Sequence, residues 1–233
     1  MKKEKLTSPE LEKYKARRTI FWGVVLFALL VIFDQVTKML SEMYLPEWNP
    51  SEKGIAVIPG WIYLVKTYNP GIAYGKFGDA QPWVKILIII GTAVLMAVFA
   101  VFYFKIDTRR TFLRMAIIFV IAGGVGNLID RLYFRIWETD CLLGVRDMVD
   151  LNKFGFAVCN FADFFITGGA VALVLSLLFF DRDALFPTGK KYKALAKEAE
   201  DKKNALVEVK GKGEVEDYEP RTDEDRREEG DNG

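Results

Sequence analysis

Four long apolar stretches constrain the fold of this chain more than any other feature of its sequence. They are rich in Ile, Val, Leu, Phe and Ala and cover about residues 20–40, 83–104, 112–134 and 158–180. Each is close to the roughly 20 residues that an α-helix needs to cross about 30 Å of hydrocarbon. We therefore expect an all-α integral membrane protein whose four transmembrane helices form one domain over residues 20–181.

The distribution of basic residues indicates how these helices are oriented. Basic side chains are dense before the first stretch and between the second and third, at Lys13, Lys15, Arg17, Arg18, Lys105, Arg109, Arg110 and Arg114. The connections 41–82 and 135–157 are less basic for their length. By the positive-inside rule, the basic segment 1–19, the turn near 105–111 and the charged tail 182–233 face the cytoplasm. Both long connections then face outward.

The first outward connection has a pattern typical of short β-strands. Apolar and aromatic residues run from Gly54 to Lys66, interrupted by the turn signal Pro59-Gly60. We expect a small extracytoplasmic β-sheet element over about 54–78, between the first two helices, with Trp61 at the level of the lipid headgroups. In the tail, alternating charges predict a short amphipathic helix near Lys190–Ala205, followed by disorder.

Composition excludes several kinds of function. The net charge of +1 averages an apolar body with two polar ends, and gives no support for nucleic-acid binding. The chain has no His, which excludes a Ser-His or Cys-His nucleophile and a His-ligated metal site. Cys141 and Cys159 are too few for a zinc site and lack CxxC spacing. We expect two unpaired thiols, with a disulfide left open if their segment faces an oxidising compartment.

Polar side chains near the helix ends are costly in hydrocarbon and therefore indicate function or buried pairing. Asp34 and Lys38 are four residues apart on one helix face, where they either pair with each other or shape a substrate site. Asn127, Asp130 and Arg131 share a face of the third helix. Asp130 with Arg131 is interpreted as a buried structural pair. An amide and a guanidinium, as in Asn127 and Arg131, also suit hydrogen bonding to a peptide backbone.

Two aspartates near the outer ends offer acid–base chemistry. Asp147 lies in the second outward connection, and Asp163 shares a face with Asn160 at the start of the fourth helix. If the connection folds back over this helix, the two carboxylates approach and one of them retains a proton near neutral pH. The pair could then activate water and protonate a leaving amine. From the residues alone, a proton- or cation-conducting transporter subunit is an equally good interpretation.

Five motifs together resemble the lipoprotein signal peptidase (signal peptidase II) family. In the family's order, they are Asp34–Lys38, Asn69–Tyr74, Gly126–Arg131, Val145–Asp150 and Asn160–Asp163. The resemblance covers about Ile20 to Phe180. It implies a multi-pass aspartyl endopeptidase of the bacterial cytoplasmic (inner) membrane, with its active site near the extracytoplasmic face. Such an enzyme removes the signal peptide of a prolipoprotein, cleaving before the cysteine that carries diacylglycerol.

The resemblance also implies roles for individual residues. The catalytic aspartates of the family match Asp147 and Asp163, with Asp150 as the rival for the first role. Positions that resemble substrate-positioning residues are Asn69, Asn127, Arg131 and Asn160, with Asp34 and Lys38 in support. Lipid-modified prolipoprotein substrates, contact with membrane phospholipid and sensitivity to globomycin-type inhibitors are implied as well. We expect a monomer and no cofactor.

The sequence departs from the family pattern in places that leave the two aspartates untouched. Residues Trp137–Gly144 look like an insertion, Tyr74 stands where Phe or Trp is common, and the charged tail is longer than the family requires. Two other functions remain as alternatives. A transporter predicts polar residues continuing down a helix, but the second and fourth stretches are almost wholly apolar below their outer ends. A scaffolding protein leaves Asn127, Arg131 and Asn160 unexplained.

Overall fold

The computed structural model describes residues 8–51, 54–71, 80–138 and 143–180, with scattered positions between 194 and 205. Its long helices are α1 (Ser8–Tyr44), α2 (Pro82–Lys105), α3 (Thr111–Tyr133) and α4 (Phe161–Leu175), the last continued by the π-helical turn η3 (Ser176–Phe180). Within this described part, four helical segments are long and apolar enough to cross a membrane, which confirms the expected fold class. Met1–Ser176 and Leu177–Gly233 form two compact units, and the residues that matter below lie in the first.

The ends of the helices follow local capping rules. α2 begins with Pro82 at its first turn, where the missing N–H of proline has no helical partner to lose. α4 begins at Phe161 rather than near 158, because Asn160 has extended backbone angles and caps the helix. α1 begins already at Ser8, so part of the basic segment 1–19 is helical. Extending α1 in this way places Lys15 and Arg18 on a rigid element.

α3 is the central helix, and it packs against α1, α2 and α4. In the most apolar 18-residue stretch of α3, 61% of the residues are buried. The corresponding stretches of α1, α2 and α4 are 6%, 17% and 11% buried. Those three helices leave large apolar side chains exposed, such as Phe21, Trp83 and Val171. This distribution fits helices whose outer faces contact lipid.

Two adjacent glycines of α4 allow a direct test of the α3–α4 contact. A Cβ atom on Gly169 would lie 2.8 Å from Val120 Cγ2 and 2.9 Å from the backbone oxygen of Ala116, whereas a Cβ on Gly168 would meet nothing within 4 Å. Gly169→Ala should therefore lower the free energy of unfolding by about 1–3 kcal/mol, as overpacking does elsewhere. Gly168→Ala is the matched control and should leave it unchanged or slightly raised. Unfolding of both variants in mixed detergent micelles measures the difference, and equal stabilities would contradict the packing described here.

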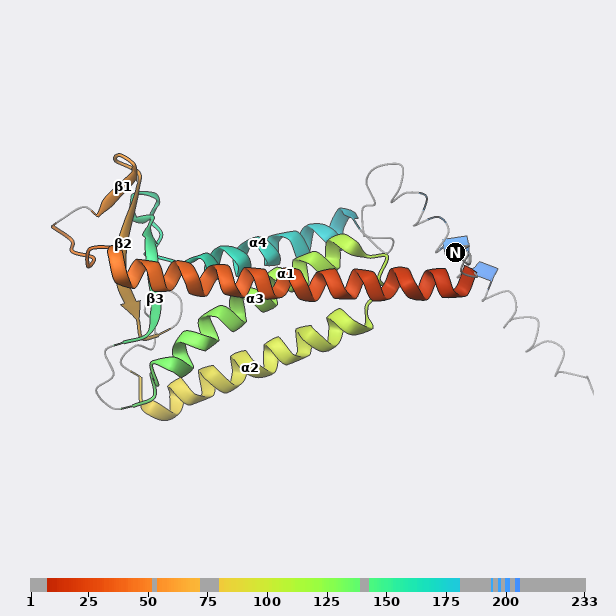
Figure 1. The fold of residues 1–233 in the computed structure, drawn as a ribbon, viewed down its shortest axis with the longest axis horizontal. Helices are drawn as coiled ribbons and strands as arrows, with labels where there is room; N and C mark the ends of the chain where they lie inside the picture. Colours follow the sequence, from red (N-terminus) through yellow and green to blue (C-terminus); the bar gives the residue numbers. More distant parts are fainter. Residues whose placement is uncertain are drawn as a thin grey trace, which may run out of the picture. The chain divides into compact units, whose positions relative to one another are not determined.

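A three-stranded antiparallel sheet lies at one end of the long helices (Figure 1). β1 (Ile55–Ile58) and β2 (Ile62–Asn69) form a hairpin, and Gly60 in its turn has a φ of 83°. β3 (Val145–Asp150) pairs with the other edge of β2, with Asp147 opposite Thr67. The sheet thus begins between the first two helices, as expected. Its third strand was not anticipated, because residues 144–151 were interpreted as a loop.

Several sequence-based expectations fall on residues outside the described ranges. They concern Cys141, Tyr74, residues 72–78 of the expected sheet element and most of the tail. The described positions between 194 and 205 are helical, within the helix expected near Lys190–Ala205. Cys159 is described and is a free thiol. The expectation for Cys141 stays a prediction.

Candidate active site

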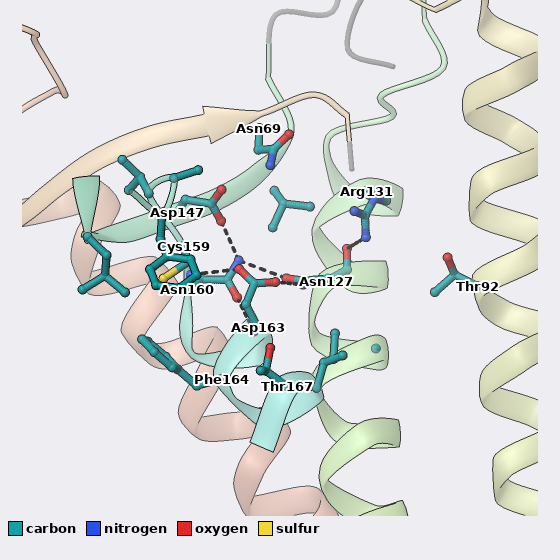
Figure 2. A pocket seen from close by; sticks show the side chains of 17 residues that line it. Asn69, Thr92, Asn127, Arg131, Asp147, Cys159, Asn160, Asp163, Phe164 and Thr167 are labelled. Atoms are coloured by element: carbon teal, nitrogen blue, oxygen red, sulfur yellow. Dashed lines mark hydrogen bonds between the residues drawn. The ribbon is translucent and has the colours of Figure 1, made fainter. Parts of the chain in front are cut away.

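A cavity of about 570 Å³ lies beside the sheet and is lined by residues of α2, α3, α4 and the strands β2 and β3. Figure 2 shows a cluster of polar side chains at one side of it. Six residues that the sequence singled out meet there: Asn69, Asn127, Arg131, Asp147, Asn160 and Asp163. The rest of the wall is largely apolar and includes Phe164 and Ile166. Asp34 and Lys38 are fully buried and do not line the cavity.

Asp147 reaches the cavity because backbone hydrogen bonds connect β3 to the segment that precedes α4. The N–H groups of Met148 and Val149 both donate to the backbone oxygen of Cys159, at 2.9 and 2.8 Å. The N–H of Cys159 donates in return to the oxygen of Val149 at 3.0 Å. The second outward connection therefore folds back over the start of the fourth helix, which is the condition under which Asp147 and Asp163 were expected to meet.

Asp163 is held by the first turn of its own helix. Asn160 and Asp163 form a reciprocal capping box. Asn160 Oδ1 accepts a hydrogen bond from the Asp163 N–H at 3.0 Å, and Asp163 Oδ2 accepts one from the Asn160 N–H at 3.0 Å. This arrangement satisfies donors that a helix start leaves without a helical partner. It also fixes the carboxylate of Asp163 at the edge of the cavity.

Two side-chain amides connect the two carboxylates (Figure 2). Asn160 Nδ2 donates to Asp147 Oδ1 at 2.6 Å and to Asn127 Oδ1 at 3.1 Å. Asn127 Nδ2 donates to Asp163 Oδ1 at 2.8 Å. Each carboxylate thus accepts a hydrogen bond from an amide, and the two amides also contact each other. Because α3, α4 and β3 all contribute to this chain of contacts, the positions of the two acids depend on one another.

Electrostatics favour a proton on Asp147 near neutral pH. Burial raises the pKa of Asp147 to about 7, and the negative charge of Asp163 acts in the same direction. The hydrogen bond from Asn160, the charge of Lys38 and a hydrogen bond from Asn69 oppose this rise in pKa. A buried acid that titrates near pH 7 beside a second acid is suited to general acid–base chemistry.

The thiol of Cys159 also lines the cavity but is poorly suited to act as a nucleophile. Burial, together with the nearby charges of Asp163 and Asp147, raises its pKa to about 12. The reactive form of cysteine is the thiolate. Cys159 therefore stays protonated at neutral pH. Within the described ranges, no group of three or more His, Cys, Asp or Glu is arranged to hold a metal ion.

Arg131 and Asn69 lie on the side of the cavity nearest the end of β2. Arg131 Nη2 donates to the backbone oxygen of Gly71 at 3.2 Å, and its Nη1 donates to the oxygen of Asn127 at 3.4 Å. Arg131 Nε is buried and has no acceptor among the described residues. Asn69 Oδ1 accepts from the Gly71 N–H at 3.1 Å, which shapes the chain just after the strand. Together these contacts provide hydrogen-bonding groups beside the two acids.

A buried ionic cluster supports the cavity from behind. Lys38 Nζ lies 2.9 Å from Asp34 Oδ2 and 3.5 Å from Asp130 Oδ2, and all three side chains are 0% exposed. Of the two roles left open for Asp34 and Lys38, the ion pair is therefore present, and the two side chains do not reach the cavity as substrate-binding groups. Lys38 also donates to Asn127 Oδ1 at 2.9 Å, and Asp34 Oδ1 accepts from the Ala162 N–H at 2.9 Å. These two acids and the lysine hold α1, α3 and α4 together.

The expected pairing of Asp130 with Arg131 was wrong, since Asp130 binds Arg146 of β3 instead. Arg146 Nη2 lies 2.7 Å from Asp130 Oδ1, and the Arg146 N–H donates to Asp130 Oδ2 at 2.9 Å. Consecutive helical residues point in directions about 100° apart, so Arg131 faces the cavity while Asp130 faces β3. Arg146 also contacts Glu42 and Gln35 of α1. Gln35 and Arg146 were not predicted to belong to the site. Both lie within the motifs Asp34–Lys38 and Val145–Asp150, and that position could have identified them.

Comparisons with known proteins agree with this arrangement. Residues 26–179 match the family described as signal peptidase (SPase) II. A lipoprotein signal peptidase of Sulfurihydrogenibium sp. is 32% identical over 66% of this chain and 89% of its own length. The lipoprotein signal peptidase of Sinorhizobium fredii is 32% identical over 70% of this chain and 92% of its own.

Solved structures show the same fold. One, a bacterial membrane enzyme at 1.9 Å resolution, has a TM-score of 0.54 and is 27% identical, covering 68% of this chain and 94% of that one. A second, also a bacterial membrane enzyme, has a TM-score of 0.54 at 26% identity. The family match covers more than half of the chain and includes every element that contributes to the cavity. The chain therefore belongs to the signal peptidase II family.

Proposed function

We propose that this protein is a membrane aspartyl endopeptidase that removes the signal peptide from diacylglyceryl-modified prolipoproteins, cleaving before the lipid-modified cysteine. One observation carries the chemistry: Asp147 and Asp163 line one cavity, joined through the amides of Asn127 and Asn160. Family membership supports the peptidase activity, and relatives named lipoprotein signal peptidases support the substrate. No cofactor enters the proposed reaction.

The two acids differ in their surroundings, which supports different roles. Both oxygens of Asp163 accept N–H donors, from Asn127 Nδ2 and from the Asn160 backbone, and these contacts fix the orientation of its carboxylate. Asp163 is then the general base that takes a proton from the attacking water. Asp147, which has a pKa raised to about 7, is the acid that protonates the leaving amine. The proton taken by one acid balances the proton given by the other.

The remaining cavity residues provide positioning. Arg131 and Asn69 would hydrogen-bond the backbone of the substrate beside the scissile bond, and Arg131 Nε still lacks an acceptor among the described residues. The apolar wall, with Phe164 and Ile166, would lie along the lipid-modified part of the substrate. Asp34 and Lys38 would act indirectly, because they hold Asn127 and the start of α4. Globomycin-type inhibitors would occupy this same cavity.

Family membership and four apolar helices make the chain a multi-pass bacterial membrane protein. We further propose that it is a monomer of the cytoplasmic membrane with both termini in the cytoplasm and the cavity near the extracytoplasmic face. The basic residues at the α2–α3 turn and in the first part of α1 support this orientation. The sheet would then lie in the outer headgroup region, where the exposed side chain of Trp61 is favourable.

The proposed reaction is tested with purified protein in lipid–detergent micelles and a precursor that carries a diacylglyceryl cysteine. The matched control is the same precursor without the lipid. Mass spectrometry should show a product that begins at the modified cysteine, and little product from the control. Cleavage at another bond, or equal cleavage of both precursors, would argue against the proposal.

The raised pKa of Asp147 predicts a pH dependence of the reaction. Below about pH 7 this acid holds its proton, and above that value it is ionised, so the leaving amine loses its proton donor. We expect kcat/KM to fall about tenfold per pH unit on the alkaline side. Initial rates across roughly pH 6 to 9, with unfolding followed in parallel, measure this dependence. Constant kcat/KM over that range in a folded enzyme would rule out the role of Asp147 as the acid.

A further inference from the structure

At the end of the bundle away from the sheet, α1, the end of α2 and the start of α3 come together (Figure 1). Residues of these three elements line a second cavity. Its volume is about 490 Å³. Three basic side chains line it, Lys15 and Arg18 of α1 and Arg114 of α3, together with the hydroxyl residues Thr19 and Thr111. None of the described residues that line it is acidic. An anion is therefore the kind of ligand that this cavity favours.

Arg114 is held rigidly at the base of this cavity. Its side chain is only 2% exposed. Nη1 donates to the backbone oxygens of Tyr103 at 2.7 Å and Ile106 at 3.0 Å, carbonyl groups at the C-terminal end of α2. The guanidinium also lies over the ring of Tyr103, 3.9 Å from its centroid. These contacts fix both the position of the guanidinium and the plane in which it lies.

The other edge of the same guanidinium has no acceptor. Nε and Nη2 of Arg114 are buried and make no hydrogen bond to any described residue. Nε and Nη2 form the side edge of the guanidinium, a fork of two donors that can bind two oxygens of a phosphate or carboxylate. Because Nη1 is already occupied, this edge is the remaining donor pair. Buried donors without an acceptor are costly and uncommon in folded proteins. Neither atom is exposed to solvent in this structure, so an anion must displace the side chains that cover this edge before it can satisfy both.

The depth of the cavity in the bundle indicates where that anion comes from. Arg114 lies in the first turn of α3, and Trp22, also in the lining, is 58% exposed at the same end of α1. Exposed tryptophan and basic residues at helix ends mark the interface between hydrocarbon and water. Phosphate groups are concentrated at that interface, and basic pockets between transmembrane helices bind anionic headgroups.

We propose that this cavity binds a phosphate group, supplied by an anionic phospholipid such as phosphatidylglycerol. Arg114 Nε and Nη2 hold two phosphate oxygens, while Lys15 and Arg18 neutralise the charge from the mouth of the cavity. The assignment to the cytoplasmic leaflet depends on the orientation proposed above. The binding itself does not depend on the peptidase activity, because the site lies at the other end of the bundle from the two aspartates.

Native mass spectrometry of the full-length protein in detergent tests the proposal by titration with phosphatidylglycerol or phosphatidylcholine of matched chain length. We expect phosphatidylglycerol to bind more tightly. Arg18→Gln should weaken its binding about fivefold, as expected for loss of one cation near a membrane surface. Arg114→Lys keeps the charge but removes the fork, and should weaken binding about tenfold. Arg109→Gln is the matched control, because Arg109 is exposed, pairs with Asp107 and does not line the cavity.

The same experiment distinguishes the sources of the phosphate and the outcomes that contradict the site. Competition by millimolar inorganic phosphate or glycerol 3-phosphate would assign the site to a soluble phosphate. No competition, with selective binding of the lipid, supports the headgroup. Arg18 is exposed and makes no ion pair with a described residue, so Arg18→Gln remains informative even if Arg114→Lys unfolds. Equal binding of both lipids, or binding unchanged in Arg18→Gln and in folded Arg114→Lys, would overturn the proposal.

Discussion

Replacing either Asp147 or Asp163 by asparagine should lower the turnover number for precursor cleavage by about a thousandfold or more, the range that acid–base catalysis contributes. Asparagine keeps the size of the side chain but can neither accept a proton from water nor donate one to the leaving amine. Both residues line the same cavity, and each is fixed there by an amide. Single-turnover cleavage of the lipid-modified precursor measures the loss in rate.

Asp150→Asn is the matched control for these variants. In the wild type, the Asp150 carboxylate accepts a hydrogen bond from the Asn152 N–H at 2.9 Å, and Asp150 is not part of the cavity lining. This variant should keep most of the activity of the wild type. Unfolding curves for all three variants separate loss of chemistry from loss of folding. Full activity of a folded Asp147→Asn or Asp163→Asn protein would refute the proposed pair, and loss in Asp150→Asn alone would transfer the role to Asp150.

Removal of the Asp130 carboxylate should cause a large loss of stability, greater than that expected for Gly169→Ala. Asp130 is 0% exposed and lies between Arg146 at 2.7 Å and Lys38 at 3.5 Å. Asp130→Ala leaves both cations buried with fewer counter-charges, and breaking a buried pair in this way typically costs about 3–5 kcal/mol. Unfolding in mixed micelles, followed by Trp fluorescence, measures the change in the free energy of unfolding.

A surface ion pair provides the comparison for this prediction. Arg135 Nη2 lies 2.7 Å from Glu138 Oε1, but the two side chains are 63% and 50% exposed. Glu138→Ala should therefore change the free energy of unfolding by less than about 1 kcal/mol. Similar losses in Glu138→Ala and Asp130→Ala would mean that burial of the cluster contributes little to its strength.

The helices could be predicted from the sequence because their signal is local. A run of about 20 apolar residues decides the length of a spanning helix whatever else the chain does. The errors in the prediction concern the helix ends, where a polar side chain can either be solvated by water or cap the helix. Asn160 was placed inside the fourth stretch, but it caps α4 from outside through its bond to the Asp163 N–H. Ser8 to Thr19 continue α1 beyond its apolar part.

The third strand could not be recognised in the same way. β3 is buried from Val145 to Val149, so it lacks the alternation of apolar and polar residues that marks a half-buried strand. Its pairing partner, β2, lies far away in the sequence, and only the fold brings the two together. The segment that carries Asp147 was therefore predicted to be a loop, although Asp147 itself was predicted to belong to the site.

Pairing between distant charges was the least predictable part of the site. On a helix, spacing shows which residues share a face but not which element that face meets. Asn127 and Arg131 do line the cavity, four residues apart, whereas Asp130 between them turns to Arg146. Only spacing within one helix was available for the prediction. It placed Asp34 and Lys38 on one face, where their ion pair was one of two alternatives, but it could not show that Asp130 meets Arg146 rather than Arg131.

The contact between Lys38 and Asn127 makes completion of the site depend on the whole bundle. Lys38 can only donate hydrogen bonds, so its 2.9 Å contact with Asn127 Oδ1 turns the NH₂ group of that amide toward Asp163. The lysine belongs to α1, which is synthesised first, and the acids belong to β3 and α4, which follow last. A partly inserted chain therefore lacks either the acids or the group that orients them, so the site proposed for proteolysis forms only when assembly in the membrane is complete.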